Sequence, residues 1–231
     1  MKLEVIVTRV DEALIADQSG ADRIELVSGI LEGGLTPSCA MIEEVVNAVG
    51  IPVNVMVRPH SQSFRYSAGD RKVMAKDIEH IRKVGANGIV IGVLSGESTI
   101  DEYALQWYLD CAEHLEVTFH RAFDELANQE ASVNTLLKYP QITRLLTSGG
   151  KSNVNDAADR VKKFVELTKG THLTVMAGSG LRVETLRAFV EKTGVKEVHF
   201  GTGARIDLDP LKNVDAGRII NIKKVMLDIG M

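Results

Sequence analysis

Residues that can move a proton stand near the carboxyl ends of several predicted β-strands: Glu25, Arg58, His120 and His199. Carboxylate and imidazole groups act as general acids and bases, and histidine titrates near neutrality. Arginine recognises a carboxylate or a phosphate through two parallel hydrogen bonds. Asp124, four positions after His120, could orient that imidazole or cap a helix. These five residues are the predicted catalytic set.

Small residues follow the last three predicted strands. They let backbone N–H groups approach an anion, and the N-terminus of a following helix adds a favourable dipole. Barrel enzymes often hold a phosphate after strands seven and eight. We therefore expect an anion-binding surface, with tight turns that bind nothing as the alternative. The predicted residues are Ser148, Gly149, Gly178, Ser179, Gly180, Gly201, Thr202 and Gly203.

The elements that must position these residues alternate between β-type runs and helix-type stretches, with strand starts about 20 to 35 residues apart. Several junctions carry a glycine that would end a helix in the left-handed conformation, among them Gly20, Gly50, Gly85 and Gly194. The strands are expected at Leu3–Val7, Arg23–Val27, Val53–Val57, Ile89–Ile91, Leu115–Phe119, Thr143–Leu146, Leu173–Met176 and Glu197–Phe200.

Eight such units without a composition break predict an α/β fold, a single (β/α)₈ barrel domain over residues 1–231. The alternative is a doubly wound sheet, but its first unit usually carries GxGxxG, which is missing here. Strand side chains alternate faces, so the aliphatic set points to the helices and a polar set points into the barrel. Glu4, Arg23 and Glu197 stand early in their strands, and we expect them to form an ion-pair network at the barrel floor.

Composition excludes several function classes. The net charge of −4 over 231 residues gives no electrostatic footprint for nucleic acid or an anionic membrane. We expect no secretion signal and no membrane span, and the two separated cysteines, Cys39 and Cys111, favour a reducing cytoplasm. Lysine is missing from the predicted strand ends, so a Schiff-base mechanism lacks its nucleophile. No motif marks a dedicated metal site.

The chain resembles the CutC family, named as copper homeostasis proteins, through motifs in order along most of its length. They are Leu3-Glu4-Val5, Gly20–Leu26, Gly33–Ser38, Arg58-Pro59, Phe64 with Tyr66-Ser67, Thr118–Asp124, Leu146–Gly149, Met176–Gly178 with Gly180, and Glu197–His199. The resemblance implies a cytoplasmic barrel, a homodimer, and a part in the control of copper homeostasis. It implies no required cofactor, with copper as a candidate, and no defined reaction.

Two departures from the family pattern bear on copper. Relatives often carry cysteine where this chain has Ile6 and Val27, and often arginine where it has His60. Cu(I) prefers thiolate and thioether ligands, so these aliphatic residues weaken a direct copper role. Three hypotheses follow: an indirect role in copper homeostasis, an acid/base enzyme for a small anionic or phosphorylated metabolite, and a direct Cu(I)-binding protein using Cys39, methionine or histidine.

Overall fold

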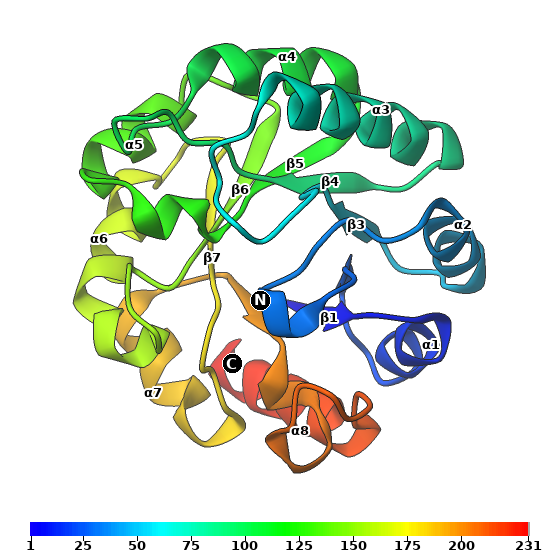
Figure 1. Ribbon diagram of the computed structural model, residues 1–231. Coiled ribbons are helices and arrows are strands. Elements are labelled where there is room, and N and C mark those ends of the chain that lie inside the picture. Colours follow the sequence, from blue (N-terminus) through cyan, green and yellow to red (C-terminus); the bar gives the residue numbers. More distant parts are fainter. Residues whose placement is uncertain (231) are drawn as a thin grey trace.

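Eight parallel β-strands pair in chain order, and the last pairs with the first, so the sheet closes into a barrel (Figure 1). This arrangement is seen in a computed structural model that describes residues 1–230. The strands are β1 (Lys2–Val7), β2 (Arg23–Leu26), β3 (Val53–Met56), β4 (Gly88–Ile91), β5 (Glu116–Phe119), β6 (Ile142–Thr147), β7 (Thr174–Ala177) and β8 (Glu197–Phe200). The predicted (β/α)₈ barrel is therefore confirmed, and the doubly wound alternative is wrong.

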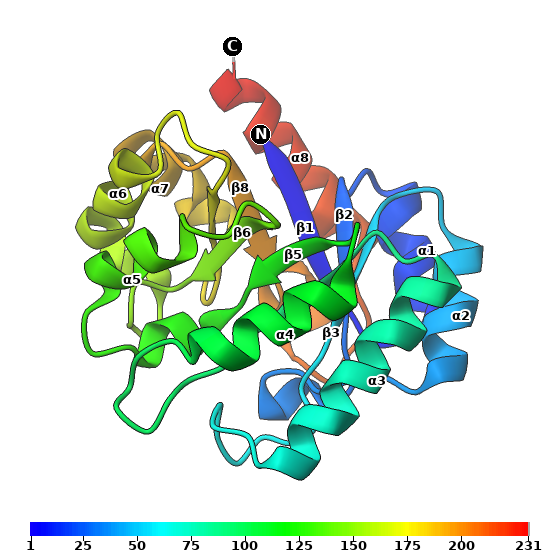
Figure 2. The ribbon, with the colours of Figure 1, turned by 90° about the horizontal axis from the view of Figure 1, so that it is seen from above.

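Helices cover the outside of this barrel, as the two ribbon views show (Figures 1 and 2). They are α1 (Val10–Gln18), α2 (Cys39–Ala48), α3 (Ala68–Val84), α4 (Glu102–Ala112), α5 (Gln129–Leu136), α6 (Ala158–Leu167), α7 (Val183–Thr193) and α8 (Ala216–Gly230). Within residues 1–230, none of the helices is long and apolar enough to cross a membrane.

Helix boundaries follow local chemistry. Ser67 and Asp70 form a reciprocal capping box at the start of α3, which satisfies two N–H groups that a helix end leaves free. Gly85 ends α3 and Gly194 ends α7 in the left-handed conformation, as predicted. The same expectation for Gly50 is wrong: its φ is not positive, and α2 ends on an extended Val49.

Alternation of strand side chains separates two layers. The outward aliphatic residues of the strands pack with the helices in one continuous core. The inward layer is largely polar; its apolar members are a small cluster of Ile6, Val27, Met56 and Val90 on the β1–β4 side, together with Leu146 and Met176. Barrel interiors are usually filled by bulky aliphatic residues, so the buried polar layer is where this barrel departs from the common pattern.

Candidate active site at the mouth of the barrel

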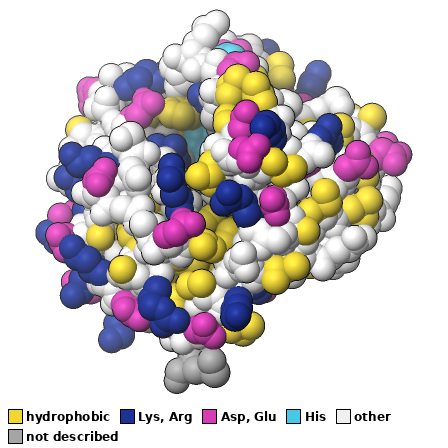
Figure 3. Space-filling model, turned by 90° about the horizontal axis from the view of Figure 1, so that it is seen from below, with side chains coloured by type: hydrophobic (Ala, Val, Ile, Leu, Met, Phe, Trp, Pro, Cys, Tyr) yellow, Lys and Arg dark blue, Asp and Glu magenta, His cyan; other side chains and the backbone are white. Residues whose placement is uncertain are grey.

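A pocket of about 720 Å³ opens at the carboxyl ends of the strands, and Glu25, Arg58, His120 and His199 all line it. They come from β2, the end of β3, the end of β5, and β8. One face of the molecule is hollowed, with a histidine visible in the depth and lysine and arginine side chains gathered near it (Figure 3). The barrel thus brings together four residues that lie up to 174 positions apart in the chain.

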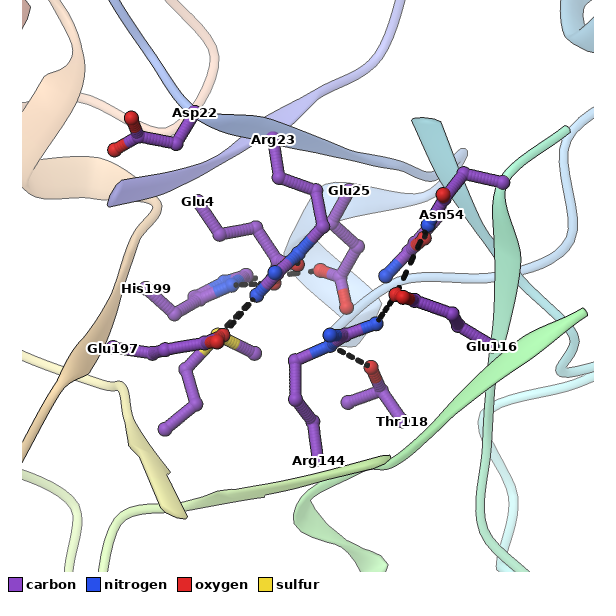
Figure 4. A network of polar contacts seen from close by, with 12 residues as sticks. Glu4, Asp22, Arg23, Glu25, Asn54, Glu116, Thr118, Arg144, Glu197 and His199 are labelled. Carbon is purple, nitrogen blue, oxygen red and sulfur yellow. Dashed lines mark hydrogen bonds and ion pairs between the residues drawn. The ribbon is translucent and has the colours of Figure 1, made fainter. Parts of the chain in front are cut away.

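Below this pocket, the floor of the barrel is an ion-pair network (Figure 4). Arg23 donates through Nε to Glu4 Oε2 at 2.5 Å and through Nη2 to Glu197 Oε2 at 2.6 Å. On the other side, Arg144 pairs with Glu116 and donates to Thr118. The predicted network of Glu4, Arg23 and Glu197 is confirmed.

The floor is joined to the pocket through His199. Its Nδ1 lies 2.9 Å from Glu4 Oε1, and its Nε2 lies 3.7 Å from Glu25 Oε2. Burial disfavours the charged imidazole, but the carboxylates of Glu25 and Glu4 outweigh it and raise the pKa of His199. The pKa of Glu4 falls to about 2, because Arg23 and His199 overcome the effect of burial. His199 therefore couples the ionisation of Glu4 at the floor to that of Glu25 at the mouth.

Glu25 differs from Glu4 in its setting. Its side chain is buried, and its Oε1 has no hydrogen-bond partner among the described residues. Burial raises its pKa to about 7, with the Glu4 carboxylate adding to the rise and His199 and Arg23 opposing it. A carboxyl group with a pKa near neutrality can both take and return a proton at physiological pH.

His120 is the first residue after β5 and caps a short 3₁₀ helix, η2 (Arg121–Glu125). Its Nδ1 accepts the N–H of Ala122 at 3.1 Å, while its Nε2 is buried and has no partner among residues 1–230. Burial, followed by the nearby charge of Arg58, lowers its pKa to about 3. His120 is therefore a neutral imidazole of the pocket lining whose Nε2–H has no partner in the described chain.

Arg58 holds the β2–α2 loop in place. Its Nη1 donates to the carbonyl oxygens of Glu32 at 2.8 Å and Gly34 at 3.2 Å, and its guanidinium lies 4.6 Å from the centre of the Phe64 ring. No carboxylate of the described chain pairs with it, and its buried Nε has no partner. Arg58 thus brings a positive charge to the mouth that the protein leaves uncompensated.

Asp124 is occupied by hydrogen bonds. Its carboxylate accepts from Thr147 Oγ1 at 2.5 Å, from the N–H of Ser148 at 3.0 Å and of Gly150 at 3.1 Å, and from Arg121 Nε at 3.0 Å. These bonds tie the segment after β5 to the loop after β6. We assign Asp124 a positioning role, since few of its lone pairs remain for proton transfer.

Only part of the predicted anion-binding surface has backbone N–H groups that are free to bind an anion. The N–H groups of Ser148, Gly149 and Gly178 donate to Asp124, Thr147 Oγ1 and the Thr147 carbonyl oxygen. Ser179, Gly180, Gly201, Thr202 and Gly203 do line the pocket, whereas Gly149 and Gly178 do not. Within the part of the chain described, the N–H groups of Ser179, Gly180, Thr202 and Gly203 donate to no protein acceptor.

Sequence reasoning missed several residues around the pocket. Lys151 and Arg182 line it, and neither side chain forms an ion pair with another described residue. Arg182 directly follows the Ser179–Leu181 loop, a position that could have drawn attention to it. Glu12 and Arg205 form a fully buried ion pair with contacts of 2.7 and 3.0 Å, which anchors the β8–α8 loop to α1. No sequence signal marks that pair.

The sulfur-containing side chains near the pocket decide whether this protein suits Cu(I). Cys39 is exposed at the start of α2 and Cys111 lies on α4, so neither thiol lines the pocket. At the positions where relatives often have cysteine, Ile6 and Val27 pack in an apolar cluster with the Met56 thioether. Because Cu(I) selects thiolate and thioether ligands, this set does not fit it.

Glu4, Glu25 and His199 bring three further ligand-type atoms within 4.8 Å of one another. Two of these groups are already engaged, because Glu4 accepts from Arg23 and His199 bonds to Glu4. The Arg23 guanidinium also supplies the positive charge that a cation would bring. The cluster is a neutralised hydrogen-bond network rather than an open set of metal ligands.

Comparison with known proteins gives a consistent result. A model described as the CutC family matches residues 1–204. The chain is 38% identical over 205 residues to a family protein CutC of Yersinia pseudotuberculosis serotype I (strain IP32953), covering 89% of this chain and 80% of that protein. A CutC family protein of Yersinia enterocolitica serotype O:8 gives the same identity and coverage.

Among solved structures, the barrel matches CutC from Streptococcus agalactiae, described there as a candidate copper homeostasis protein. The TM-score is 0.81 at 27% identity, with 86% of this chain and 97% of that chain covered. Phosphoribosyl anthranilate isomerase from Thermotoga maritima gives a TM-score of 0.65 at 13% identity, with 99% of both chains covered. At that identity the second match shows the fold alone.

Proposed function

The chain belongs to the CutC family, and from that premise we propose that it acts in copper homeostasis indirectly, through a small anionic ligand bound at the mouth of the barrel. The family role supports the first part of the proposal, since the related Streptococcus agalactiae structure is described as that of a candidate copper homeostasis protein. The poor fit of the donor atoms to Cu(I) supports an indirect role.

One observation supports an anionic ligand. Three cationic side chains line the pocket without a carboxylate partner in residues 1–230: Arg58, Lys151 and Arg182. Backbone N–H groups without a protein acceptor in the described chain belong to pocket-lining residues of the β7–α7 and β8–α8 loops, close to the N-terminus of α7. Positive charge, unengaged N–H groups and a helix dipole together favour a phosphate or carboxylate group.

Inorganic phosphate tests the anion directly. We expect millimolar phosphate to raise the melting temperature and to bind measurably by calorimetry, because a ligand that binds only the folded state stabilises it. Removing Arg182 and Lys151 together, as Arg182→Ala/Lys151→Ala, should weaken phosphate about tenfold or more, since each would lose a charge-assisted contact. Arg187→Ala is the matched control, because Arg187 is exposed on α7 and faces Glu191 and Asp228. Absence of phosphate binding to the unaltered protein would refute the anion site.

Copper is tested by titration of Cu(I) against a competing chelator. We expect neither the unaltered protein nor Cys39→Ser to hold Cu(I) tightly, because one exposed thiol provides a single soft ligand. The variant Ile6→Cys/Val27→Cys should gain Cu(I) binding, since it places two thiols in the same buried cluster as Met56, whose thioether is a third soft ligand. Tight binding by the unaltered protein that disappears in Cys39→Ser would make this a copper-binding protein instead.

We propose further that the protein is a cytoplasmic homodimer, as the family resemblance implies. Both cysteines are free, which suits a reducing compartment. Ile220 and Leu227 are exposed at 54% and 67% and lie seven positions apart on α8, so they share one helix face that a second copy would cover. Light scattering should report a dimer that Leu227→Lys dissociates, and cell fractionation tests the compartment.

A further inference from the structure

We propose that the mouth of this barrel is an active site for proton transfer at a carbon next to a carbonyl group, on a phosphorylated hydroxycarbonyl compound. Glu25 is the base that removes and returns the proton, and His120 donates a hydrogen bond to the carbonyl oxygen. The inference rests on the proposed anion site, which would hold the phosphate of the substrate. It adds the class of substrate and the class of reaction.

His120 is fixed as a hydrogen-bond donor by its neighbours. Since its Nδ1 accepts the N–H of Ala122, the ring hydrogen of the neutral imidazole is on Nε2. That Nε2 is buried in a residue only 4% exposed and has no partner in residues 1–230, although the residue lines the pocket. With its pKa lowered to about 3, the ring stays neutral at physiological pH, so it polarises an oxygen without acting as a base.

Close packing against neighbouring residues also fixes the orientation of that ring. The Phe64 ring lies 4.9 Å from it, centre to centre, and Phe64 lines the pocket as well. Gly92 packs directly against the imidazole, because a Cβ at that position would come within 2.4 Å of the ring. Only glycine leaves the space that the ring occupies. A donor held in one direction costs no reorganisation when negative charge develops on an oxygen in front of it.

Glu25 has the properties of the matching base. Its side chain is 2% exposed, it lines the pocket, and its Oε1 is free. His199 lies 3.7 Å from its other oxygen and is itself held by Glu4, which orients the Glu25 carboxyl. A base of near-neutral pKa, which burial produces here, is suited to abstracting a weakly acidic C–H proton and giving it back.

The proposed step balances without a co-reactant. The C–H bond next to the carbonyl breaks, and its proton moves to Glu25 Oε1. The electron pair of that bond forms a C=C bond, while the carbonyl π pair moves to oxygen, where the Nε2–H of His120 stabilises the enolate. Glu25 then returns the proton to the carbon from which it came, or to the former carbonyl carbon. In the second case the hydrogen of the adjacent hydroxyl group moves to the former carbonyl oxygen, so that the carbonyl and the hydroxyl group exchange places. The outcome is an isomerisation, or exchange of that hydrogen with solvent.

Other reaction classes lack their groups in this pocket. Covalent catalysis by serine needs an adjacent base that is free to take the proton. The carboxylate of Asp124 lies 2.8 Å from Ser148 Oγ, but it already accepts from Thr147, Gly150 and Arg121. Ser179 Oγ donates to the Ser152 carbonyl oxygen at 2.8 Å. Of the buried polar atoms at the mouth that have no partner in the described chain, two can take part in proton transfer: a carboxylate oxygen of Glu25 and the Nε2–H of His120. Enolisation requires those two groups.

Binding of 2-phosphoglycolate against inorganic phosphate provides the first test. Its planar carboxylate next to a phosphate imitates the charge of the enolate. We expect it to bind about 10² times more tightly than phosphate, as intermediate analogues do. Two single variants are compared: His120→Asn, which keeps an acceptor for the N–H of Ala122, and Glu25→Gln. Each should lose most of the preference for 2-phosphoglycolate while it still binds phosphate. Equal affinity for the two anions, or an unchanged preference in both variants, would overturn the inference.

Hydrogen exchange provides the second test. The protein is incubated in D₂O with three- to five-carbon hydroxycarbonyl phosphates, including dihydroxyacetone phosphate and ribulose 5-phosphate, and exchange next to the carbonyl is followed by proton NMR. We expect exchange that falls by about 10²–10⁴ in Glu25→Gln and is unchanged in Glu102→Gln, whose carboxylate faces Lys138 and Tyr139 on the outside. Absence of exchange from every compound overturns the chemistry.

The two proposals fail in different ways. If phosphate binds but 2-phosphoglycolate has no advantage and no hydrogen exchanges, enolisation is refuted and the anion site stands. If phosphate does not bind at all, the proposed function is refuted and the enolisation inference falls with it.

Discussion

The two ends of the barrel interior treat buried charge in opposite ways. At the floor, each buried arginine is paired: Arg23 with Glu4 and Glu197, and Arg144 with Glu116. At the mouth, Glu25 Oε1, His120 Nε2 and Arg58 Nε are buried without a partner in the described chain. Burying an unpaired polar group costs free energy, so a protein retains one where a ligand can complete it. The charged groups are paired at the floor, and the charged or titratable groups at the mouth keep unpaired atoms, which divides the interior into a structural part and a binding part.

The largest expected effect comes from breaking the floor. Arg23→Ala leaves Glu4 and Glu197 buried without their common partner, and we expect it to lower the free energy of unfolding by about 3–5 kcal/mol. Urea denaturation measures the loss. The exposed control Arg187→Ala should change stability by less than about 1 kcal/mol. If Arg23→Ala were as mild as the control, the floor would not be the structural part of the interior.

The next effect concerns Glu25 and pH. Its folded pKa of about 7 lies above its ordinary value, so the folded protein holds this proton more firmly than the unfolded chain. The stability it contributes is complete below about pH 4.5 and is lost as pH rises through about 7, a change of about 3 kcal/mol. The charged groups facing it are His199, Glu4 and Arg23. His199, whose pKa is also raised, loses its contribution in the same direction.

Comparison of the unaltered protein with Glu25→Gln isolates this effect. The difference in free energy of unfolding between them should shift in favour of the variant as the pH is raised from about 4.5 to about 8. Glu102→Gln, on the outer surface, is the control for a general loss of charge. Parallel stability curves for the unaltered protein and Glu25→Gln would show that the Glu25 carboxyl is not the buried, unpaired group described here.

The floor was predictable from the sequence for a physical reason. Period-two alternation fixes which side chains point inward, and charges at equivalent depths in neighbouring strands must pair, so Glu4, Arg23 and Glu197 could be placed together. The strands were also predicted within one or two residues of where they lie, because aliphatic alternation and helix-ending glycines mark them locally. The Gly50 prediction failed where Asp17, distant in sequence, accepts the Gly50 N–H and an extended chain replaces the turn.

The mouth was predictable only in part. Strand ends converge in any such barrel, so Glu25, Arg58, His120 and His199 could be grouped. The sequence could not show that the Asp124 carboxylate accepts hydrogen bonds from the loop after β6. Nor could it show that the N–H groups of Ser148 and Gly149 donate to protein acceptors. It also could not show that His199 links the floor to Glu25, since that depends on side-chain distances across the sheet. Loops set these details, and loop geometry follows from tertiary contacts.

A smaller expected effect separates position from chemistry at the mouth. Gly92→Ala would place a methyl group 2.4 Å from the His120 ring, which has to move. We expect a stability loss of about 1–3 kcal/mol, typical of overpacking, together with loss of the preference for 2-phosphoglycolate. Gly96→Ala is the matched control, because nothing lies within 4 Å of its Cβ position. Retention of the preference in Gly92→Ala would show that the direction of the imidazole is unimportant.

The last prediction is that the protonation of His120 does not change with pH. Burial and the charge of Arg58 lower the pKa of His120 to about 3, so its ring should not titrate between about pH 5 and pH 9. Nitrogen-15 NMR of the imidazole, assigned with His120→Asn, should show Nε2 carrying the hydrogen throughout that range, because Nδ1 accepts from Ala122. His199, held between two carboxylates, should instead gain its proton at a pH above the usual one for histidine. A His120 signal that moves with pH in this range would mean that the ring becomes charged. In that case the mouth would hold a proton-transfer histidine, and its difference from the paired arginines of the floor would lie in a titrating group and not in a fixed donor.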